Sequence, residues 1–430
     1  MITPPEFLRP LLAVPVAVLG AGVSGRAVVA LIERLGGAAR LFDENSADGC
    51  DTFRPGGAGE FKLVVYSPGF PPTHPWIIAA RAAGCTCLGE LDFASVFWRG
   101  SVVAITGTNG KTTLTEFLTH ALRSIGRDAT AVGNIGRAFS QAVVDRGGGA
   151  PDSVAVCEVS SFQAETLRHF RADAALWINF AEDHLERHAS EESYFLAKWR
   201  LFERTIGGHV FAGSSVQEAA EHFGQSLPPG ASVATLAQPG DVLLRGTVFD
   251  DYPQRENFLM AAAWWRAAGL REGALYAAAQ SYLLGPHRLA CVTETEGVQW
   301  WNDSKATNFH ATEAALARFG RAVVLIAGGK AKGGDVAAFV QRIAPRVKVA
   351  FLIGETRNVL ATFFGAANVP HRVCTDLAEA VRFAAVAARP GDNVLLSPGF
   401  ASLDQFCSYA DRGAQFERLV NNLGATSVLE

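Results

Sequence analysis

The chain lacks the features that mark several specialised protein classes. Only 19% of its 430 residues are charged, and a formal net charge of -4 with no basic stripe argues against nucleic acid and membrane surfaces as partners. The apolar start, residues 11–19, is too short to cross a bilayer. It contains Pro15 and runs into a glycine turn, so it predicts a first strand and not a signal peptide. The sequence has no low-complexity segment and no short repeat.

Cysteine is scarce and follows no disulfide or zinc pattern. The count is odd and the residues are scattered: Cys50, Cys85, Cys87, Cys157, Cys291, Cys374 and Cys407. This usage predicts reduced thiols and a cytoplasmic protein. Cys85 and Cys87 would share a face of one strand, and we interpret them as structural residues, not metal ligands.

Length and periodicity predict an α/β protein of three domains. The chain is too long for one hydrophobic core, and 49% of it is hydrophobic. Apolar strands alternate with amphipathic helices, which favours mainly parallel sheets. We expect a Rossmann-like N-terminal domain over residues 1–98, a central P-loop ATPase-like parallel-sheet domain over 99–285 and a Rossmann-like C-terminal domain over 286–430. Turn clusters at 228–230 and 238–240 predict a loop-rich region, and 285–287 a linker.

The seven residues from Gly107 to Thr113 are the most informative segment. They follow an apolar run, 101–106, which predicts a buried strand, and precede a predicted helix over 114–125. A glycine turn between strand and helix presents backbone N–H groups to phosphate, Lys111 adds a charge, and Thr112 offers a hydroxyl to Mg²⁺. Ile105 stands where the strict P-loop pattern has glycine, so an ordinary strand-to-helix turn is the alternative.

A second glycine turn lies near the N-terminus. Gly20, Gly22 and Gly25 match the dinucleotide-binding pattern and follow a predicted strand over 14–19. Asp43 ends the next predicted strand, near the offset expected for an acid that binds ribose. The alternative is a tight strand–helix contact without a ligand.

Further polar groups follow other predicted strands. Glu158 comes after the strand 154–157 and is suited to hold Mg²⁺, unless it is a surface acid. His184, in an acidic cluster, is a candidate metal ligand or an ordinary histidine. Lys198 lies on an apolar helix, 191–204, either as a snorkelling side chain or as an amine of lowered pKa.

These clusters fall at predicted carboxyl ends of strands, where ligands bind in parallel sheets. The segment 303–308 packs an acid, a lysine and hydroxyls at a strand–helix junction, and Thr307 or Asn308 would cap the helix. The segments concerned are 107–113, Glu158, 179–184, 303–308, 328–332 and 397–402.

Taken in order, these motifs resemble the Mur ligase family of peptidoglycan synthesis, and the resemblance covers nearly the whole chain. The first and last segments are most similar to its glutamate-adding branch. The matching segments are Gly20–Gly25, 67–69, 107–113, 133–136, 158–163, 182–188, Lys198, 286–288, 302–308 and 397–404.

The resemblance implies an ATP-driven amide ligation that adds D-glutamate to UDP-N-acetylmuramoyl-L-alanine through an acyl phosphate, although the residues themselves do not fix the enantiomer. By resemblance the catalytic residues are Lys111, Glu158, His184 and Lys198. Two Mg²⁺ sites are implied, with Thr112 and Glu158 at one and His184 and a carbamylated Lys198 at the other. The implied ATP contacts are Gly107, Thr108, Asn109, Gly110, Lys111, Thr112, Thr113, Asn257, Arg288, Asp303 and Lys305.

The first domain would then hold the UDP group of the substrate and not NAD. The residues implied for the UDP-linked substrate are Val23, Ser24, Asp43, Glu44, Ser67, Pro68, Gly69, Asn134 and Gln163. Those implied for glutamate are Thr307, Lys332, Ser402 and Tyr409. We expect small-molecule partners only, and a monomer.

Three positions depart from the family pattern. Glu256 stands in place of a histidine before Asn257, and Met260 in place of a second asparagine near the adenine. The glycine-rich turn after residue 327 offers two lysines, Lys330 and Lys332, where the family has one. Position 409 is often phenylalanine and here is Tyr409.

Three other functions compete with this interpretation. An NAD-linked oxidoreductase would use Gly20–Gly25 but leaves the P-loop and Lys198 unexplained. A related ligase, adding L-glutamate or resembling folylpolyglutamate synthase, is closer, but the folate enzyme does not need the first domain. A nucleotide-gated binding module leaves residues 303–308 without a purpose.

Overall fold

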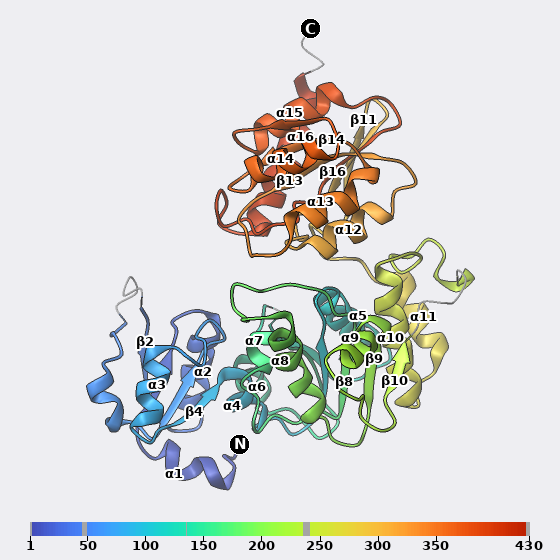
Figure 1. The fold of residues 1–430 in the computed structure, drawn as a ribbon. Coiled ribbons are helices and arrows are strands. Elements are labelled where there is room, and N and C mark those ends of the chain that lie inside the picture. The colour runs from blue at the N-terminus through green and yellow to red at the C-terminus, as the bar shows by residue number, and fades with distance from the viewer. Residues whose placement is uncertain (1, 45–49, 135, 235–240, 427–430) are drawn as a thin grey trace. The chain divides into compact units, whose positions relative to one another are not determined.

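The computed structural model describes residues 2–44, 50–134, 136–234 and 241–426, which divide into two compact units (Figure 1). The first comprises Met1–Phe180, Glu192–Thr247 and Glu256–Tyr282, and the second Ala181–Glu191, Val248–Arg255 and Leu283–Glu430. Ile135 of one motif, and the predicted turn at 238–240, lie outside the described residues. Among the helices described, none combines the length and the apolar character that crossing a membrane requires.

The first unit begins with a four-stranded parallel sheet of order β2-β1-β3-β4. Helix α2 covers one face with Val28 and Leu31, and Trp76 of α3 packs on the other. Both faces are therefore buried, as expected for strands that read as continuous apolar runs. The elements are α1 (Arg9–Leu12), β1 (Val16–Leu19), α2 (Val23–Arg34), β2 (Ala39–Phe42), β3 (Leu63–Tyr66), α3 (Pro75–Ala82), β4 (Thr86–Gly89) and α4 (Glu90–Ser95).

A six-stranded parallel sheet of order β10-β9-β8-β5-β7-β6 follows in the same unit. Strands β6 and β7 lie on one side of β5, whereas β8, β9 and β10 lie on the other side. The turn after β5 therefore lies at a topological switch point, flanked by β7 and β8. The elements are β5 (Ser101–Thr106), α5 (Lys111–Ser124), β6 (Ala129–Gly133), α6 (Phe139–Arg146), β7 (Val154–Glu158), α7 (Ser161–Ala164), β8 (Ala174–Trp177), α8 (Glu191–Glu203), β9 (Val210–Gly213), α9 (Ser214–His222), β10 (Ser232–Ala234), α10 (Gln254–Ala267) and α11 (Glu272–Ser281).

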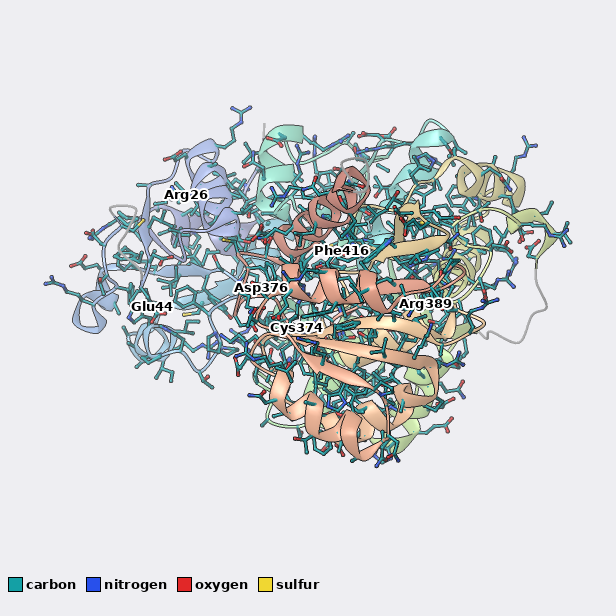
Figure 2. The ribbon with its side chains drawn as sticks, turned by 90° about the horizontal axis from the view of Figure 1, so that it is seen from above. Arg26, Glu44, Cys374, Asp376, Arg389 and Phe416 are labelled. Carbon is teal, nitrogen blue, oxygen red and sulfur yellow. The ribbon has the colours of Figure 1, made fainter. Side chains whose placement is uncertain are left out.

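The second unit has a six-stranded sheet of order β11-β12-β16-β13-β14-β15, in which only β11 is antiparallel to its neighbour. One core contains Phe339 of α13, and the other contains Cys374 and Phe416, labelled in Figure 2. The elements are β11 (Ala290–Thr295), β12 (Val298–Asn302), α12 (Phe309–Ala317), β13 (Val323–Gly328), α13 (Val336–Ile343), β14 (Val347–Ile353), α14 (Arg357–Ala366), β15 (His371–Val373), α15 (Leu377–Ala387), β16 (Asn393–Leu396) and α16 (Tyr409–Thr426).

The α/β class and the mainly parallel sheets are confirmed, whereas several predicted element ends were wrong. The first strand begins at Val16 and not at residue 14, because Pro15 supplies no N–H to the ladder. Helix α5 begins at Lys111, three residues before the apolar periodicity starts, since its first turn faces the glycine turn. Glu158 is the last residue of β7 and does not follow it.

Candidate active site

The turn after β5 has the geometry of a phosphate cradle. Gly110 adopts a left-handed φ of 83°, and α5 starts at the next residue. A Cβ at Gly110 would lie 2.4 Å from Asn257 Oδ1, so a side chain there would force either the turn or Asn257 to shift. Lys111 folds over the turn, and its Nζ donates 2.9 Å hydrogen bonds to the carbonyl oxygens of Gly107 and Thr108. The charge of Lys111 therefore lies on the turn that faces the helix N-terminus.

The strands on either side of β5 contribute the next polar groups. Glu158, at the end of β7, is 2% exposed, and its Oε1 accepts a 2.8 Å hydrogen bond from Asn134 Nδ2. In the described part of the chain, no donor reaches Glu158 Oε2, which is buried. A buried carboxylate oxygen without a donor beside a phosphate cradle suits a divalent cation, since a charged group needs a compensating partner.

Asn179 after β8 fixes the phosphate cradle from the other side. Its Oδ1 accepts a 2.9 Å hydrogen bond from the N–H of Asn109, and its backbone oxygen accepts one from the N–H of Thr108. Its Nδ2 donates over 3.4 Å to Glu256 on α10. Burial raises the pKa of the Glu256 carboxyl above its usual range.

Lys198 reaches the phosphate cradle from α8. Its side chain is 1% exposed, and Nζ donates to the carbonyl oxygen of Gly107 at 2.8 Å and to Thr106 Oγ1 at 3.2 Å. The ammonium group also lies 4.9 Å from the centre of the Tyr194 ring. The snorkelling interpretation was therefore wrong, because the amine points inward to the turn and not to water.

The first sheet gathers several of the predicted UDP contacts at its carboxyl end. Asp43 Oδ2 accepts a 2.6 Å hydrogen bond from the N–H of Ala21, which ties the end of β2 to the glycine turn after β1. A Cβ at Gly20 would lie 2.7 Å from Ser67 Oγ, the residue after β3. Val23, the first residue of α2, is 69% exposed, as a contact for a ligand above this turn requires.

Two further residues predicted to contact the UDP-linked substrate, Glu44 and Gln163, have different hydrogen-bond partners. Glu44 Oε1 lies 3.0 Å from His74 Nε2. Gln163 is buried at the start of α7, where its Oε1 accepts from the N–H and the hydroxyl of Ser160 in a capping box. Only the amide nitrogen of Gln163 is left to face a substrate.

In the second unit, the loops before β11 and after β12 bring two predicted ATP contacts together. Asp303 Oδ1 accepts a 3.1 Å hydrogen bond from the N–H of Leu289, next to Arg288, and Oδ2 accepts one of 2.8 Å from the hydroxyl of Ser397. Burial raises the pKa of Asp303 to about 7, although these donors and Arg288 oppose the shift. Lys305 Nζ lies 3.9 Å from the centre of the Tyr409 ring.

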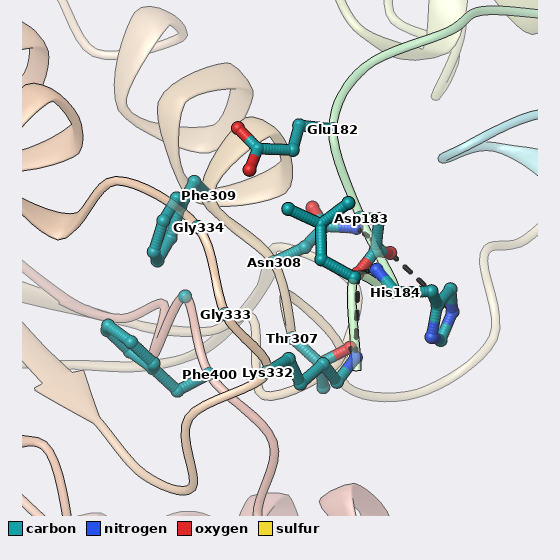
Figure 3. Close-up of a pocket in the computed structure, with 12 residues that line it drawn as sticks. Glu182, Asp183, His184, Thr307, Asn308, Phe309, Lys332, Gly333, Gly334 and Phe400 are labelled. Carbon is teal, nitrogen blue, oxygen red and sulfur yellow. Dashed lines mark hydrogen bonds and ion pairs between the residues drawn. The ribbon is translucent and has the colours of Figure 1, made fainter. Parts of the chain in front are cut away.

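A pocket in this unit contains two of the predicted glutamate contacts (Figure 3). Lys332 Nζ donates over 3.4 Å to Thr307 Oγ1 and lies 3.9 Å from Asp183 Oδ1. Asp183 Oδ2 accepts a 2.9 Å hydrogen bond from Asn308, which caps α12 through its Oδ1. The pocket thus offers a lysine and a hydroxyl to a carboxylate. Its lining is Glu182, Asp183, His184, Leu185, Thr307, Asn308, Phe309, Lys332, Gly333, Gly334, Gly399 and Phe400.

The geometry separates the two lysines of the glycine-rich turn. Lys332 lines the pocket with its side chain 22% exposed. Lys330 is exposed, and its backbone pairs with Ala401. His184 lines the same pocket with a φ of 56°, and its Nδ1 lies 3.0 Å from Glu186 Oε1. His184 belongs to the second unit, whereas Lys198 and Glu158 belong to the first.

Ser402 and Tyr409 do not line this pocket, but Arg412, on the same helix α16 as Tyr409, fixes the loop that carries Ser402. Arg412 is fully buried on α16 and donates to the carbonyl oxygens of Phe400 at 3.2 Å and Ser304 at 2.9 Å. Burial lowers the pKa of its guanidinium to about 10. Arg412 therefore connects the loop after β16 with the loop after β12.

The sequence reasoning named Glu256 only as a departure from the family pattern, and it assigned no role to Asn179, Asp183 or Arg412. Asn179 and Asp183 lie inside a cluster that was recognised, and their position after β8 was an available signal. Arg412 had no local signal, because an arginine on an amphipathic helix normally faces water. Among the described residues there is no group of three histidine, cysteine or acidic side chains placed to hold a metal ion.

Two family descriptions match the chain. The Mur ligase middle domain matches residues 105–224, and the Mur ligase glutamate ligase domain matches residues 287–400. The first range contains the phosphate cradle, Glu158 and Lys198. The second range contains Lys332 and the rest of the pocket lining, except for residues 182–185, which fall in the first range.

Curated relatives match over most of their length. Three proteins named UDP-N-acetylmuramoylalanine–D-glutamate ligase serve as examples. The one from Solibacter usitatus is 36% identical, and the match covers 84% of this chain and 85% of that protein. The one from Pelotomaculum thermopropionicum is 35% identical, and the match covers 95% of this chain and 97% of that protein. The one from Myxococcus xanthus is 38% identical over 86% of each chain.

Solved structures share the fold at low sequence identity. The UDP-N-acetylmuramate-alanine ligase MurC of Thermotoga maritima superimposes with a TM-score of 0.59 at 15% identity, covering 95% of this chain and 99% of its own. The MurF ligase of Thermotoga maritima, solved with ADP, superimposes with a TM-score of 0.56 at 16% identity. The match covers 84% of this chain and 96% of that structure. FolC of E. coli superimposes with a TM-score of 0.54 at 19% identity, and the match covers 76% of this chain and 91% of that structure.

Proposed function

The chain belongs to the Mur ligase family, and we propose that it adds D-glutamate to UDP-N-acetylmuramoyl-L-alanine in peptidoglycan precursor synthesis. The observation that carries this proposal is the identity of 34–38% to D-glutamate ligases over most of the chain. The NAD-linked oxidoreductase is excluded by the same relatives. The folate ligase is a weaker candidate, because FolC matches at 19% identity and over a smaller part of the chain.

The reaction is an ATP-dependent amide ligation. A free carboxylate is a poor acyl donor, so the substrate carboxylate first attacks the γ-phosphorus of ATP, which forms an acyl phosphate and releases ADP. The amine of glutamate then attacks the acyl carbon, the bond between that carbon and the bridging oxygen breaks, and phosphate leaves with this oxygen while the amine gives up a proton. Because both reactants of the first step are anions, cationic groups must neutralise the charge that gathers between them.

Residues of the phosphate cradle are suited to this task. We assign the ATP phosphates to the turn 107–113, where the N-terminus of α5 and Lys111 provide positive charge. Thr112 and Glu158 would hold one Mg²⁺, which supplies charge neutralisation when bound, and the buried Glu158 Oε2 supports this assignment. Asn257, Arg288, Asp303 and Lys305 remain proposed nucleotide contacts.

A second Mg²⁺ held by His184 and a carbamylated Lys198 rests on the family resemblance. The burial of the Lys198 amine beside Gly107 supports a special role for it. Carbamylation requires the ammonium group to lose one proton first. The neutral amine then adds to CO₂, which forms an N–C bond and releases a second proton, so that a cation becomes a carboxylate ligand. An unmodified ammonium group cannot ligate a metal.

The substrates are assigned to the ends of the first and third sheets. The UDP group would contact the carboxyl end of β1, β2 and β3 through Val23, Ser24, Asp43, Glu44 and residues 67–69, with Asn134 and Gln163 nearer the reaction. Glutamate would bind in the Lys332 pocket with Thr307, and Ser402 and Tyr409 would complete its site. The domain limits 1–98, 99–285 and 286–430 follow the three sheets and remain our proposal.

We further propose a cytoplasmic monomer. All seven cysteines are free, and Cys291 and Cys407 are exposed, which supports a reducing compartment. Sedimentation equilibrium of the pure protein tests the oligomeric state.

Phosphate release tests the function directly. The pure protein is incubated with ATP, Mg²⁺ and UDP-N-acetylmuramoyl-L-alanine, together with D-glutamate, L-glutamate or no amino acid. We expect phosphate and a new UDP-linked product with D-glutamate only. Product formation with L-glutamate at an equal rate, or with a folate acceptor instead, would overturn the assignment.

A further inference from the structure

We propose that Thr356 is a positioning residue for the incoming amino acid: it fixes the glycine-rich turn, residues 328–334, so that Lys332 reaches a carboxylate of glutamate. The inference rests on the D-glutamate ligation proposed above and deepens it. Asp404 acts with Thr356, because it fixes the loop of Thr356 against the loop that carries Ser402. Both side chains act through other residues and not through a contact with substrate.

The loop that contains Thr356, residues 354–356, lies beside two loops with proposed glutamate contacts. It follows β14, and the glycine-rich turn follows the neighbouring strand β13. The loop of Ser402 follows β16, which is the other neighbour of β13, and all three strands are parallel. Loops that follow adjacent parallel strands lie at one edge of the sheet, so these three loops can contact one another directly.

Thr356 holds the glycine-rich turn by three hydrogen bonds to one residue. Its hydroxyl donates to the carbonyl oxygen of Gly329 at 3.0 Å and accepts from the N–H of Gly329 at 3.2 Å. The N–H of Thr356 donates to the same carbonyl oxygen at 3.1 Å. Thr356 is 5% exposed, so these bonds are shielded from water. A hydroxyl can donate and accept at the same time, whereas the methyl group of a valine can do neither.

The glycine-rich turn needs such a partner because its glycines allow many backbone conformations. Gly329 has a φ of 151°, and a Cβ there would lie 2.2 Å from the carbonyl oxygen of Ala401. Lys330 pairs with Ala401 through backbone hydrogen bonds of 2.8 and 3.2 Å. The backbone that enters the turn is therefore fixed by Thr356 and by Ala401. Two further glycines follow Lys332, so its position depends on these contacts.

Asp404 extends this arrangement to Ser402, which lies two residues before it. Asp404 Oδ2 accepts a 2.8 Å hydrogen bond from the N–H of Glu355. A Cβ on Gly354 would lie 2.4 Å from that oxygen and 2.6 Å from the Cα of Gly329, so a side chain there would force one of the three loops to shift. The two loops with proposed glutamate contacts are therefore held at a fixed separation.

Loss of this arrangement should affect glutamate and not ATP. Among the described residues, the side-chain hydrogen bonds of Thr356 go to Gly329 alone. Lys332 lies three residues further along the same turn, and its Nζ lies 3.4 Å from Thr307 Oγ1 in the pocket of Figure 3. The proposed nucleotide contacts of this unit lie on the loops before β11 and after β12, namely Arg288, Asp303 and Lys305.

Steady-state kinetics of the full-length protein test the proposal. Thr356→Val keeps the shape and removes the hydroxyl, so the Michaelis constant for D-glutamate should rise about tenfold while that for ATP stays within about twofold of wild type. Thr356→Ser keeps the hydroxyl and should behave like the wild type. Thr362→Val is the matched control, because Thr362 is exposed and its hydroxyl donates to Asn358 within α14. Equal rises for glutamate and ATP, or no rise for glutamate, would contradict the proposal.

A double variant distinguishes positioning from a general loss of structure. If Thr356 acts through Lys332, the rise caused by Thr356→Val should be absent in a protein that already carries Lys332→Ala. The same rise in both backgrounds would reject the proposal.

The aspartate provides a second test if Thr356→Val shows no cooperative melting transition. Asp404→Ala removes the acceptor for the N–H of Glu355 and should raise the Michaelis constant for glutamate, whereas Asp404→Asn keeps an acceptor and should raise it less. An unchanged Michaelis constant in Asp404→Ala would then reject the proposal.

Hydrogen exchange separates this inference from the proposed function. The N–H of Gly329 donates to Thr356, so its exchange should be about tenfold faster in Thr356→Val than in the wild type or in Thr362→Val. Faster exchange, with no ligase product from the wild-type protein, would refute D-glutamate ligation and leave the contact between Thr356 and the turn established. Normal ligation, with exchange and Michaelis constants unchanged in Thr356→Val, would refute the role of Thr356 alone.

Discussion

Lys198 Nζ donates a 2.8 Å hydrogen bond to the carbonyl oxygen of Gly107, the first residue of the phosphate-binding turn. A lysine that is 1% exposed is thus fixed against the turn proposed to hold the ATP phosphates. This hydrogen bond connects helix α8 with the turn after β5, and both belong to the first unit. A substitution of Lys198 therefore removes a direct contact to the phosphate cradle.

Replacing Lys198 should therefore stop catalysis. We expect Lys198→Ala to lose turnover at ambient CO₂ and to recover part of it when a short carboxylate such as acetate is added, because that anion replaces the carbamate. In the wild-type protein, ¹³C NMR after incubation with ¹³C-bicarbonate should show a carbamate resonance that Lys198→Ala lacks. Lys62→Ala, an exposed lysine, is the control. Full activity of Lys198→Ala without additive would refute the role.

A methyl group at Gly110 should abolish ATP binding. The new Cβ would lie 2.4 Å from Asn257 Oδ1, and Asn257 is buried, so either the turn or this proposed nucleotide contact must move. We expect the dissociation constant for ATP to rise by tenfold or more, on the order of 1.4 kcal/mol. Gly126→Ala is the matched control, because Gly126 has a φ of 78° but nothing within 4 Å. Equal ATP affinities of the two variants would contradict this account.

Lys332 and Lys330 should differ in their effect on glutamate. Lys332 lines the pocket with Thr307, so Lys332→Ala should leave a bound carboxylate unpaired, at a cost of about 2–5 kcal/mol of binding. The Michaelis constant for glutamate should rise while that for ATP stays near normal. Lys330→Ala should have a mild effect, because that side chain is exposed. A large glutamate defect in Lys330→Ala alone would move the assignment to Lys330.

Asp303 should make stability depend on pH. Its folded pKa is raised to about 7 from 3.8, so between these values the native state binds a proton that the unfolded state has lost. The free energy of unfolding must then fall as the pH rises through this window. Asp303→Asn removes the effect, so the melting temperature of the wild-type protein relative to this variant should be lower at about pH 8 than at about pH 5. Asp152→Asn, an exposed carboxyl, is the control, and a pH-independent difference would show that Asp303 does not titrate there.

Much of the fold follows from patterns within short stretches of sequence. The run 101–106, the glycine turn and the periodic helix after it predicted a phosphate cradle because strand, turn and helix preferences depend on near neighbours. The order of strands and helices predicted parallel sheets, and polar clusters at strand ends predicted the ligand-binding edge. Element ends were less certain, since the first turn of α5 carries no apolar periodicity.

Where the sequence offered two similar residues for one role, only the tertiary structure distinguished their environments. Two lysines lie two positions apart in one turn, yet Lys332 lines a pocket and Lys330 pairs its backbone with Ala401. Of Thr307 and Asn308, Asn308 caps α12, while Thr307 faces Lys332. The burial of Arg412 depends on loops more than a hundred residues away in sequence, such as that of Ser304. Sequence patterns determine local conformation because they act through neighbours, whereas burial, partners and pKa depend on contacts between distant segments.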